Sequence, residues 1–126
     1  QTARLFELRI GLTEDYPDPK TYTLEDVGEL IACWLQTQQE SSEPYLPGSL
    51  ESGVMCDASR KFSTTVPKPV VFYRGDVSPL YNDGLSDEMV IKTLQELAEV
   101  LANAFGQTKI HLRFWGTIQE LERSPR

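Results

Sequence analysis

The sequence predicts an α+β fold in which a four-stranded antiparallel sheet carries two helices on one face. Three observations lead to this prediction. Strand and helix patterns follow one another in the order βαββαβ, each of the two helices has a single apolar stripe, and 126 residues are the size of one domain. Two helices with one stripe each are both satisfied when they pack on the same face of the sheet. We therefore expect one domain over residues 1–126, with 117–126 as a strand extension or a frayed tail.

The first strand and the first helix have clear local signals. Residues 5 to 12 alternate apolar and polar side chains, which is typical of a strand with one buried face. Residues 13 to 22 hold two prolines and three acids and are predicted as a loop. Thr23, with Asp26 three residues later, forms a short capping box and predicts a helix that runs to about Gln38. The apolar residues of this helix recur at helical spacing: Val27, Leu30, Ile31 and Trp34.

The second and third strands are joined by a long connection. Residues 41 to 49 form a cluster of helix breakers that turns the chain back. Residues 50 to 57 have a weaker strand pattern, in which Gly53 indicates a bulge or a sheet edge. A polar connection with two prolines, residues 58 to 69, leads into residues 70 to 77, which are rich in β-branched and aromatic side chains and predict a strand.

The second helix and the last strand complete the domain. Ser86 is expected to cap a helix whose first turn is acidic, and Gly106 stands where a left-handed residue ends a helix. Its apolar stripe consists of Val90, Leu94, Leu97, Ala98, Leu101, Ala104 and Phe105. Residues 109 to 115 alternate again and predict the final strand.

The order of these elements sets the expected topology. Right-handed crossovers place the strands at 5–12 and 70–77 in the centre and those at 50–57 and 109–115 at the edges. This arrangement resembles small ferredoxin-like proteins, including uncharacterised ones carried on mobile gene cassettes. The stretch from Ser86 through the letters GQTKIHL is similar to their second helix entering a last strand. The resemblance implies the fold and transfers no function.

Charge and cysteine content narrow the class of protein. The net charge of −7 disfavours nucleic-acid binding, because it repels phosphate backbones. No apolar run is long enough to cross a membrane and no signal-peptide pattern is present, so we expect a cytoplasmic protein without a membrane partner. Cys33 and Cys56 lie in no CxxC motif and have no histidine nearby in sequence. We expect two buried reduced thiols and neither a metal nor a cofactor.

The most informative surface is the sheet face turned away from the helices. Pairing the strands as predicted places on it a set of charged and aromatic side chains, with Val71 beside them: Glu7, Arg9, Tyr73, His111, Arg113 and Trp115. Ordinary cross-strand pairs, such as Glu7 with Arg113, would explain part of this set. The exposed rings favour a covered patch. We therefore favour a non-enzymatic binding or assembly module, a homo-oligomer through this face or through the edge of the last strand, with a protein or small-molecule ligand as the other occupant.

The alternative is a small enzyme or small-molecule-binding protein. Its pocket would lie near His111, between the sheet face and the loops at 41–49 and 58–69. His111 is the only histidine and is therefore the natural acid or base near neutral pH, with Glu7 or a neighbouring carboxylate to orient it. No nucleophile can be placed beside it, so the sequence favours a protein that is not an enzyme.

Two further functions have weaker sequence support. Stacking of RNA bases on the sheet would use Tyr73 and Trp115 alone, against the net charge. The acidic loops at 14–18 and 81–88 carry oxygen ligands of the kind a hard cation prefers. Neither loop matches the spacing of an EF-hand, and the acids of the second loop already serve as turn formers and caps, so no metal is predicted.

Overall fold

The computed structural model describes residues 4–56, 67–77, 84–114 and 117–122. Seven elements follow one another along the chain: β1 (Leu5–Gly11), α1 (Leu24–Glu40), β2 (Ser49–Met55), β3 (Lys68–Asp76), α3 (Asp87–Phe105), β4 (Lys109–Phe114) and β5 (Thr117–Glu122). The predicted connection at 58–69 lies almost wholly outside the described residues, as does Trp115.

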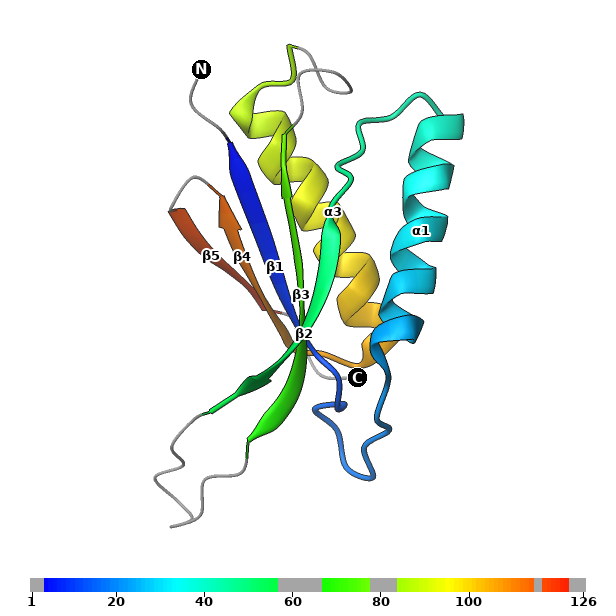
Figure 1. Cartoon of the computed structure of the whole chain (residues 1–126), viewed down its shortest axis with the longest axis vertical. Helices are drawn as coiled ribbons and strands as arrows, with labels where there is room; N and C mark the ends of the chain where they lie inside the picture. Colours follow the sequence, from blue (N-terminus) through cyan, green and yellow to red (C-terminus); the bar gives the residue numbers. More distant parts are fainter. Residues whose placement is uncertain (1–3, 57–66, 78–83, 115–116, 123–126) are drawn as a thin grey trace.

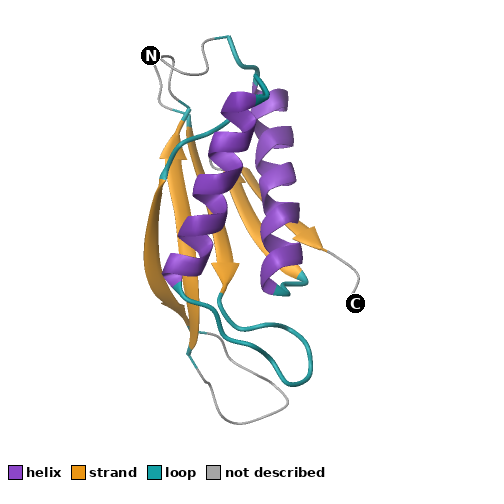
Figure 2. Ribbon diagram, turned by 90° about the vertical axis from the view of Figure 1, so that its right-hand side faces the viewer, coloured by secondary structure: helices purple, strands orange, loops and turns teal. Residues whose placement is uncertain are grey.

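The strands form one antiparallel sheet in the order β2-β3-β1-β4-β5. Both helices lie on the same face of it (Figures 1 and 2). This confirms the predicted α+β, ferredoxin-like fold, with β3 and β1 as inner strands and β2 at an edge. The expectation that β4 forms the other edge was wrong, because the chain reverses after β4 and returns beside it as β5. The segment 117–122 is therefore a fifth strand, and the edge of β4 is not free.

Helix α1 begins with the predicted capping box. The Thr23 hydroxyl accepts from the backbone N–H of Asp26 at 3.1 Å, and the Asp26 carboxylate accepts from the backbone N–H of Thr23 at 2.9 Å. The helix ends at Glu40, two residues later than predicted. Only Val27 and Ile31 are fully buried along it, as expected for a helix that lies over the sheet with one narrow stripe.

Helix α3 also begins and ends as predicted. The Ser86 hydroxyl accepts from the backbone N–H of Met89 at 3.2 Å, and Gly106 adopts the left-handed conformation with φ of 59°. A Cβ at Gly106 would also lie 2.8 Å from the Glu14 side chain, so glycine is required there for space as well as for its backbone angle. The C-terminal end of α3 is thus packed against the loop that follows β1.

The core lies between the sheet and the helices and includes Tyr73, contrary to prediction. Val71 and Tyr73 pair with Ile10 and Leu8 of β1 and are buried with them. The Tyr73 hydroxyl donates to the Leu46 carbonyl at 2.6 Å, which satisfies its polar atom in the core. Burial raises the pKa of this hydroxyl well above its ordinary value. The opposite face of β3 therefore carries Val70, Phe72 and Arg74.

Both cysteines are exposed, so the expectation of buried thiols was wrong. Cys33 follows Ile31 by two positions on α1, which turns it about 200° away from the buried stripe. Cys56 directly follows the last residue of β2, an edge strand. Among the helices that the structure describes, none is both long and apolar enough to cross a membrane.

Candidate functional site

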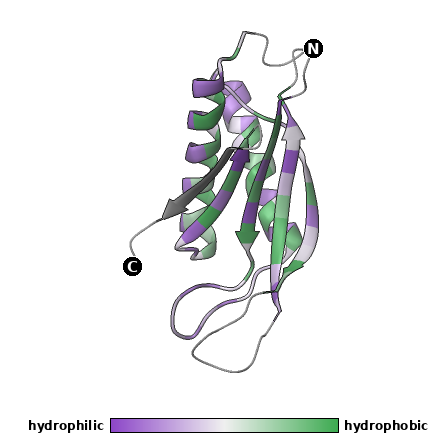
Figure 3. Ribbon diagram, turned by 90° about the vertical axis from the view of Figure 1, so that its left-hand side faces the viewer, coloured by the Kyte–Doolittle hydropathy of each residue, from purple (hydrophilic) through white to green (hydrophobic). Residues whose placement is uncertain are grey.

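The helix-free face of the sheet is turned toward the viewer in Figure 3, where hydrophilic and hydrophobic residues alternate along the strands. Four predicted residues lie on it: Glu7 and Arg9 of β1 beside His111 and Arg113 of β4. Tyr73 does not, because it is in the core. In its place β3 presents Phe72 and Arg74 and β2 presents Glu51, three residues for which the sequence analysis proposed no role.

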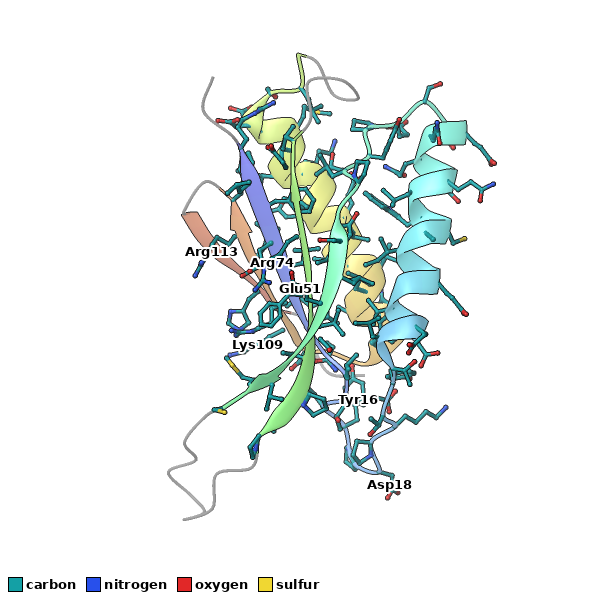
Figure 4. The ribbon with its side chains drawn as sticks, in the orientation of Figure 1. Tyr16, Asp18, Glu51, Arg74, Lys109 and Arg113 are labelled. Atoms are coloured by element: carbon teal, nitrogen blue, oxygen red, sulfur yellow. The ribbon has the colours of Figure 1, made fainter. Side chains whose placement is uncertain are left out.

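The middle of this face is occupied by an ionic network centred on Arg74. Its guanidinium donates to Glu7 at 2.6 Å and to Glu51 at 2.7 Å (Figure 4). It also lies over the Phe72 ring, 4.5 Å from the ring centroid. The hydrogen bond to Glu7 is the main cause that raises the pKa of Arg74. Glu7 thus binds Arg74 and not Arg113, the cross-strand partner suggested by the sequence.

Gly53 of β2 makes room for this network. Of the two structures predicted for Gly53, a bulge or a sheet edge, the edge is observed: β2 is an edge strand, and its pairing with β3 runs without interruption from Ser49 to Met55. A Cβ at Gly53 would lie 2.7 Å from the Phe72 ring. The glycine therefore allows the ring to lie close against β2, beneath the arginine.

Two cavities open on the same face, and the network forms part of the wall of the first of them. The Arg113 pocket, of about 600 Å³, is lined by Leu5, Glu7, Ser49, Arg74, Asp76 and Arg113 among others. The His111 pocket, of about 510 Å³, lies where the sheet face meets the β1–α1 loop, the start of β4 and the base of the β2–β3 hairpin. Its lining includes Arg9, Gly11, Glu14, Met55, Val70, Gln107 and His111. Among the described residues, it is the cavity that contains both Arg9 and His111.

The floor of the His111 pocket depends on Gly11. A Cβ at this position would lie 2.4 Å from the Gln107 side-chain oxygen, so glycine is required for close approach. The Gln107 amide nitrogen donates to the carbonyls of Thr13 at 2.8 Å and Phe105 at 3.1 Å. Gln107 therefore joins the end of α3 to the loop after β1, across 94 positions of sequence.

The rim of the pocket contains two acids from the β1–α1 loop. Asp15 accepts from the backbone N–H of Thr108 at 2.8 Å and from its hydroxyl at 3.0 Å. Glu14 is only 8% exposed and accepts from the Tyr22 hydroxyl at 2.9 Å and from the backbone N–H of Lys20 at 3.1 Å. These bonds hold the loop that was considered as a cation site.

Among the described residues no group of three or more potential metal ligands gathers. Residues 81–83 of the second acidic loop lie outside the described ranges.

The lining of the His111 pocket combines an apolar wall with both signs of charge. Met55, Pro67, Pro69 and Val70 supply the apolar wall. Val70 is 5% exposed although it lies on the sheet face opposite to the helices. The cations are Arg9, Lys68, Lys109 and, when protonated, His111; the acids are Glu14 and Asp15. Such a pocket suits a ligand that is partly aromatic or aliphatic and partly zwitterionic.

Comparison of the chain with known proteins finds a similar fold but no similar sequence. No protein-family model matches the chain, and no curated protein matches its sequence. Its fold is similar to that of phage SAM lyases in two solved structures. One is a phage SAM lyase in complex with S-methyl-5'-thioadenosine, with a TM-score of 0.69 and 16% identity; the other is a phage SAM lyase in its apo state, with 0.66 and 18%. Each match covers 96% of this chain and 90% of the other.

These matches overturn the preference for a non-enzymatic assembly module. The two solved structures reported above match nearly the whole chain, and both are those of an enzyme. The sequence analysis disfavoured catalysis because no nucleophile could be placed beside His111, and not every enzyme uses a nucleophile from the protein. At this identity the likeness establishes the shared ferredoxin-like fold. The resemblance to mobile-cassette proteins is tested by none of the comparisons and stays a prediction.

Proposed function

We propose that this protein is an enzyme that binds S-adenosylmethionine (SAM) in the His111 pocket and releases S-methyl-5'-thioadenosine from it. The observation that carries the proposal is the combination, in one cavity of about 510 Å³, of an apolar wall and side chains of both charges. A cavity of this size falls in the range of roughly 300–1,000 Å³ that is usual for small-molecule sites. The likeness to phage SAM lyases supports the choice of substrate.

The chemistry of SAM matches the pocket group by group. Its adenine is a flat aromatic ring whose face suits the apolar wall formed by Met55, Pro69 and Val70. Its sulfonium and ammonium groups are cations, which the carboxylates of Glu14 and Asp15 favour electrostatically. Its carboxylate is an anion, which suits the cationic side of the lining. A neutral nucleoside alone would not use the charged groups.

His111 is the candidate group for proton transfer in this proposal. The sulfonium departs as a neutral thioether, so no acid is needed to assist it. The bond that breaks joins sulfur to Cγ of the amino acid arm. A base can take a proton from the adjacent carbon, Cβ, while a C=C bond forms between Cβ and Cγ and the electron pair of the C–S bond stays on sulfur. His111 is the only histidine in the sequence and lines the pocket, which makes it the natural base near neutral pH.

The experiment is to incubate the purified chain with SAM and to quantify S-methyl-5'-thioadenosine by liquid chromatography. A protein-free sample measures the spontaneous breakdown of SAM. We expect the thioadenosine to accumulate in proportion to protein concentration and the rate to saturate with SAM. A rate equal to that of the protein-free sample, together with no rise in the unfolding midpoint on addition of S-methyl-5'-thioadenosine, would reject the proposal.

A further inference from the structure

Arg9, Lys68 and Lys109 are the lysine and arginine side chains that line the His111 pocket, and the structure distinguishes Arg9 among them. Arg9 is half-buried on β1, between Phe72 of β3 and His111 of β4, its cross-strand neighbours. Within the described ranges its guanidinium makes no ion pair and no hydrogen bond. A guanidinium carries five N–H donors in a planar fork that fits a carboxylate with two parallel bonds. Arg9 therefore presents an unused carboxylate-binding group to the pocket.

The acids around Arg9 whose side chains the structure describes are bound elsewhere. Glu7 lies two positions earlier on the same face of the same strand, and Arg74 holds it at 2.6 Å. The two acids of the pocket rim accept hydrogen bonds from within the β1–α1 loop and from the residue before β4. The charge of Arg9 is thus left for a group that is not part of the described fold.

We propose that Arg9 binds the α-carboxylate of the amino acid arm of SAM. This inference rests on the proposed function and adds to it the group by which the substrate is selected. When the C–S bond breaks, the carboxylate leaves with the amino acid fragment and the nucleoside keeps no anion. Arg9 then contributes affinity to the intact substrate and none to S-methyl-5'-thioadenosine. The pocket consequently prefers a nucleoside with an amino acid arm to the thioether that it releases.

Two stable ligands test this inference. S-adenosylhomocysteine and S-methyl-5'-thioadenosine share the thioether nucleoside, and only the first carries the amino acid arm. Isothermal titration calorimetry on the wild type and on Arg9→Gln gives the dissociation constants of both. We expect Arg9→Gln to weaken S-adenosylhomocysteine by about 10- to 100-fold, as for the loss of hydrogen bonds to a charged group, and to change S-methyl-5'-thioadenosine by less than about twofold. Arg9→Lys keeps the charge without the fork and should give an intermediate loss.

The matched control is Arg113→Gln. It removes the same charge from the same sheet face but outside the His111 pocket, and should leave both dissociation constants unchanged. An Arg9→Gln effect that is equal for the two ligands, or absent for both, would overturn the inference while binding of S-methyl-5'-thioadenosine leaves the proposed function intact. If the wild type binds S-methyl-5'-thioadenosine but not S-adenosylhomocysteine, the inference also fails. If it binds neither ligand, the proposed function fails first. Arg9→Lys provides the reading if Arg9→Gln does not fold.

Discussion

Arg74 and Arg9 lie on neighbouring strands of the same sheet face and have opposite surroundings. Arg74 binds two carboxylates and covers an aromatic ring. Arg9 has no such partner among the described residues and lines a cavity. The same side chain therefore stabilises the fold in one place and is available to a ligand in the other. Charged residues on an open sheet face are informative about function only after their partners are known.

The sheet face also differs between the two regions in the side chains that fill it. Near Arg74, the face is filled by Phe72, whose ring lies against Gly53. Near Arg9, Gly11 allows the Gln107 side chain to lie close to β1, and both residues line the cavity. Each glycine thus gives room to one side chain, but only the pair of Gly11 and Gln107 belongs to the His111 pocket. Four substitutions break or sharpen this comparison, and they follow in order of expected effect.

His111→Gln should have the largest effect. Loss of the proposed base is expected to lower kcat for release of S-methyl-5'-thioadenosine by about 100-fold, within the range for general base catalysis. KM for SAM should change much less, because glutamine keeps a polar group of similar size in the lining. Steady-state kinetics at several pH values is the measurement. A kcat within about threefold of the wild type would remove His111 from the chemistry and leave it as part of the wall.

Gly11→Val should close the floor of the His111 pocket. The new side chain must displace Gln107, whose oxygen already lies 2.4 Å from the position of a Cβ. Overpacking of this kind costs about 1–3 kcal/mol in the free energy of unfolding, measured by chemical denaturation. Calorimetry should show no binding of S-methyl-5'-thioadenosine by the folded variant. Gly53→Ala, which crowds Phe72 in the other region, is the control and should retain binding; equal affinities in both variants would contradict the placement of the ligand.

Tyr73→Phe tests the assignment of Tyr73 to the core. The Leu46 carbonyl would lose its donor in a buried position, which costs about 1–2 kcal/mol in the free energy of unfolding. Denaturant titration measures this loss, and the kinetic constants for SAM should not change. If Tyr73 belonged to the ligand-binding face, as the sequence suggested, the substitution would change KM and leave stability unaffected.

Arg74→Gln should have the smallest effect. Its ion pairs are partly exposed, and such pairs contribute about 1 kcal/mol or less each. We expect a slight fall in the free energy of unfolding and a KM for SAM within about twofold of the wild type. High salt should reduce the difference between variant and wild type, because it screens the pairs. A rise in the dissociation constant of S-adenosylhomocysteine as large as that expected for Arg9→Gln would show that the two arginines do not differ in function.

The fold was predictable because its main signals are local. The capping box at Thr23 and the serine and glycine at the two ends of α3 specify both helices from a few adjacent residues. The alternation in β1 and β4 places Glu7 and Arg9 correctly, since polar and apolar residues are well separated there.

The rest depends on contacts that sequence spacing does not contain. Residues 70–73 of β3 are four successive apolar or aromatic side chains, so their alternation does not say which pair is buried; the pairing with β1 decides it. The fifth strand is defined by its pairing with β4. The pocket joins Gly11 and Thr13 to Gln107, and only the folded chain brings them together. The glutamine was noted as part of a helix-to-strand junction but had no signal of its own.

The oligomeric state expected from the sequence stays a prediction. The chain is expected to form a homo-oligomer through the helix-free face, and light scattering would measure the mass of that oligomer. The route through the edge of β4 is closed by β5. The charged network around Arg74 is already satisfied within the chain, so a second copy is not needed to neutralise it.

A two-dimensional NMR titration of the ¹⁵N-labelled chain with S-methyl-5'-thioadenosine tests most directly that the His111 pocket is the ligand site. We predict that the backbone amide signals of Arg9, Gly11, Gln107 and His111 shift with a common saturation curve, while those of Ser49, Arg74 and Arg113 do not. Shifts confined to the second group, or no shifts at a millimolar concentration of the nucleoside, would contradict the account.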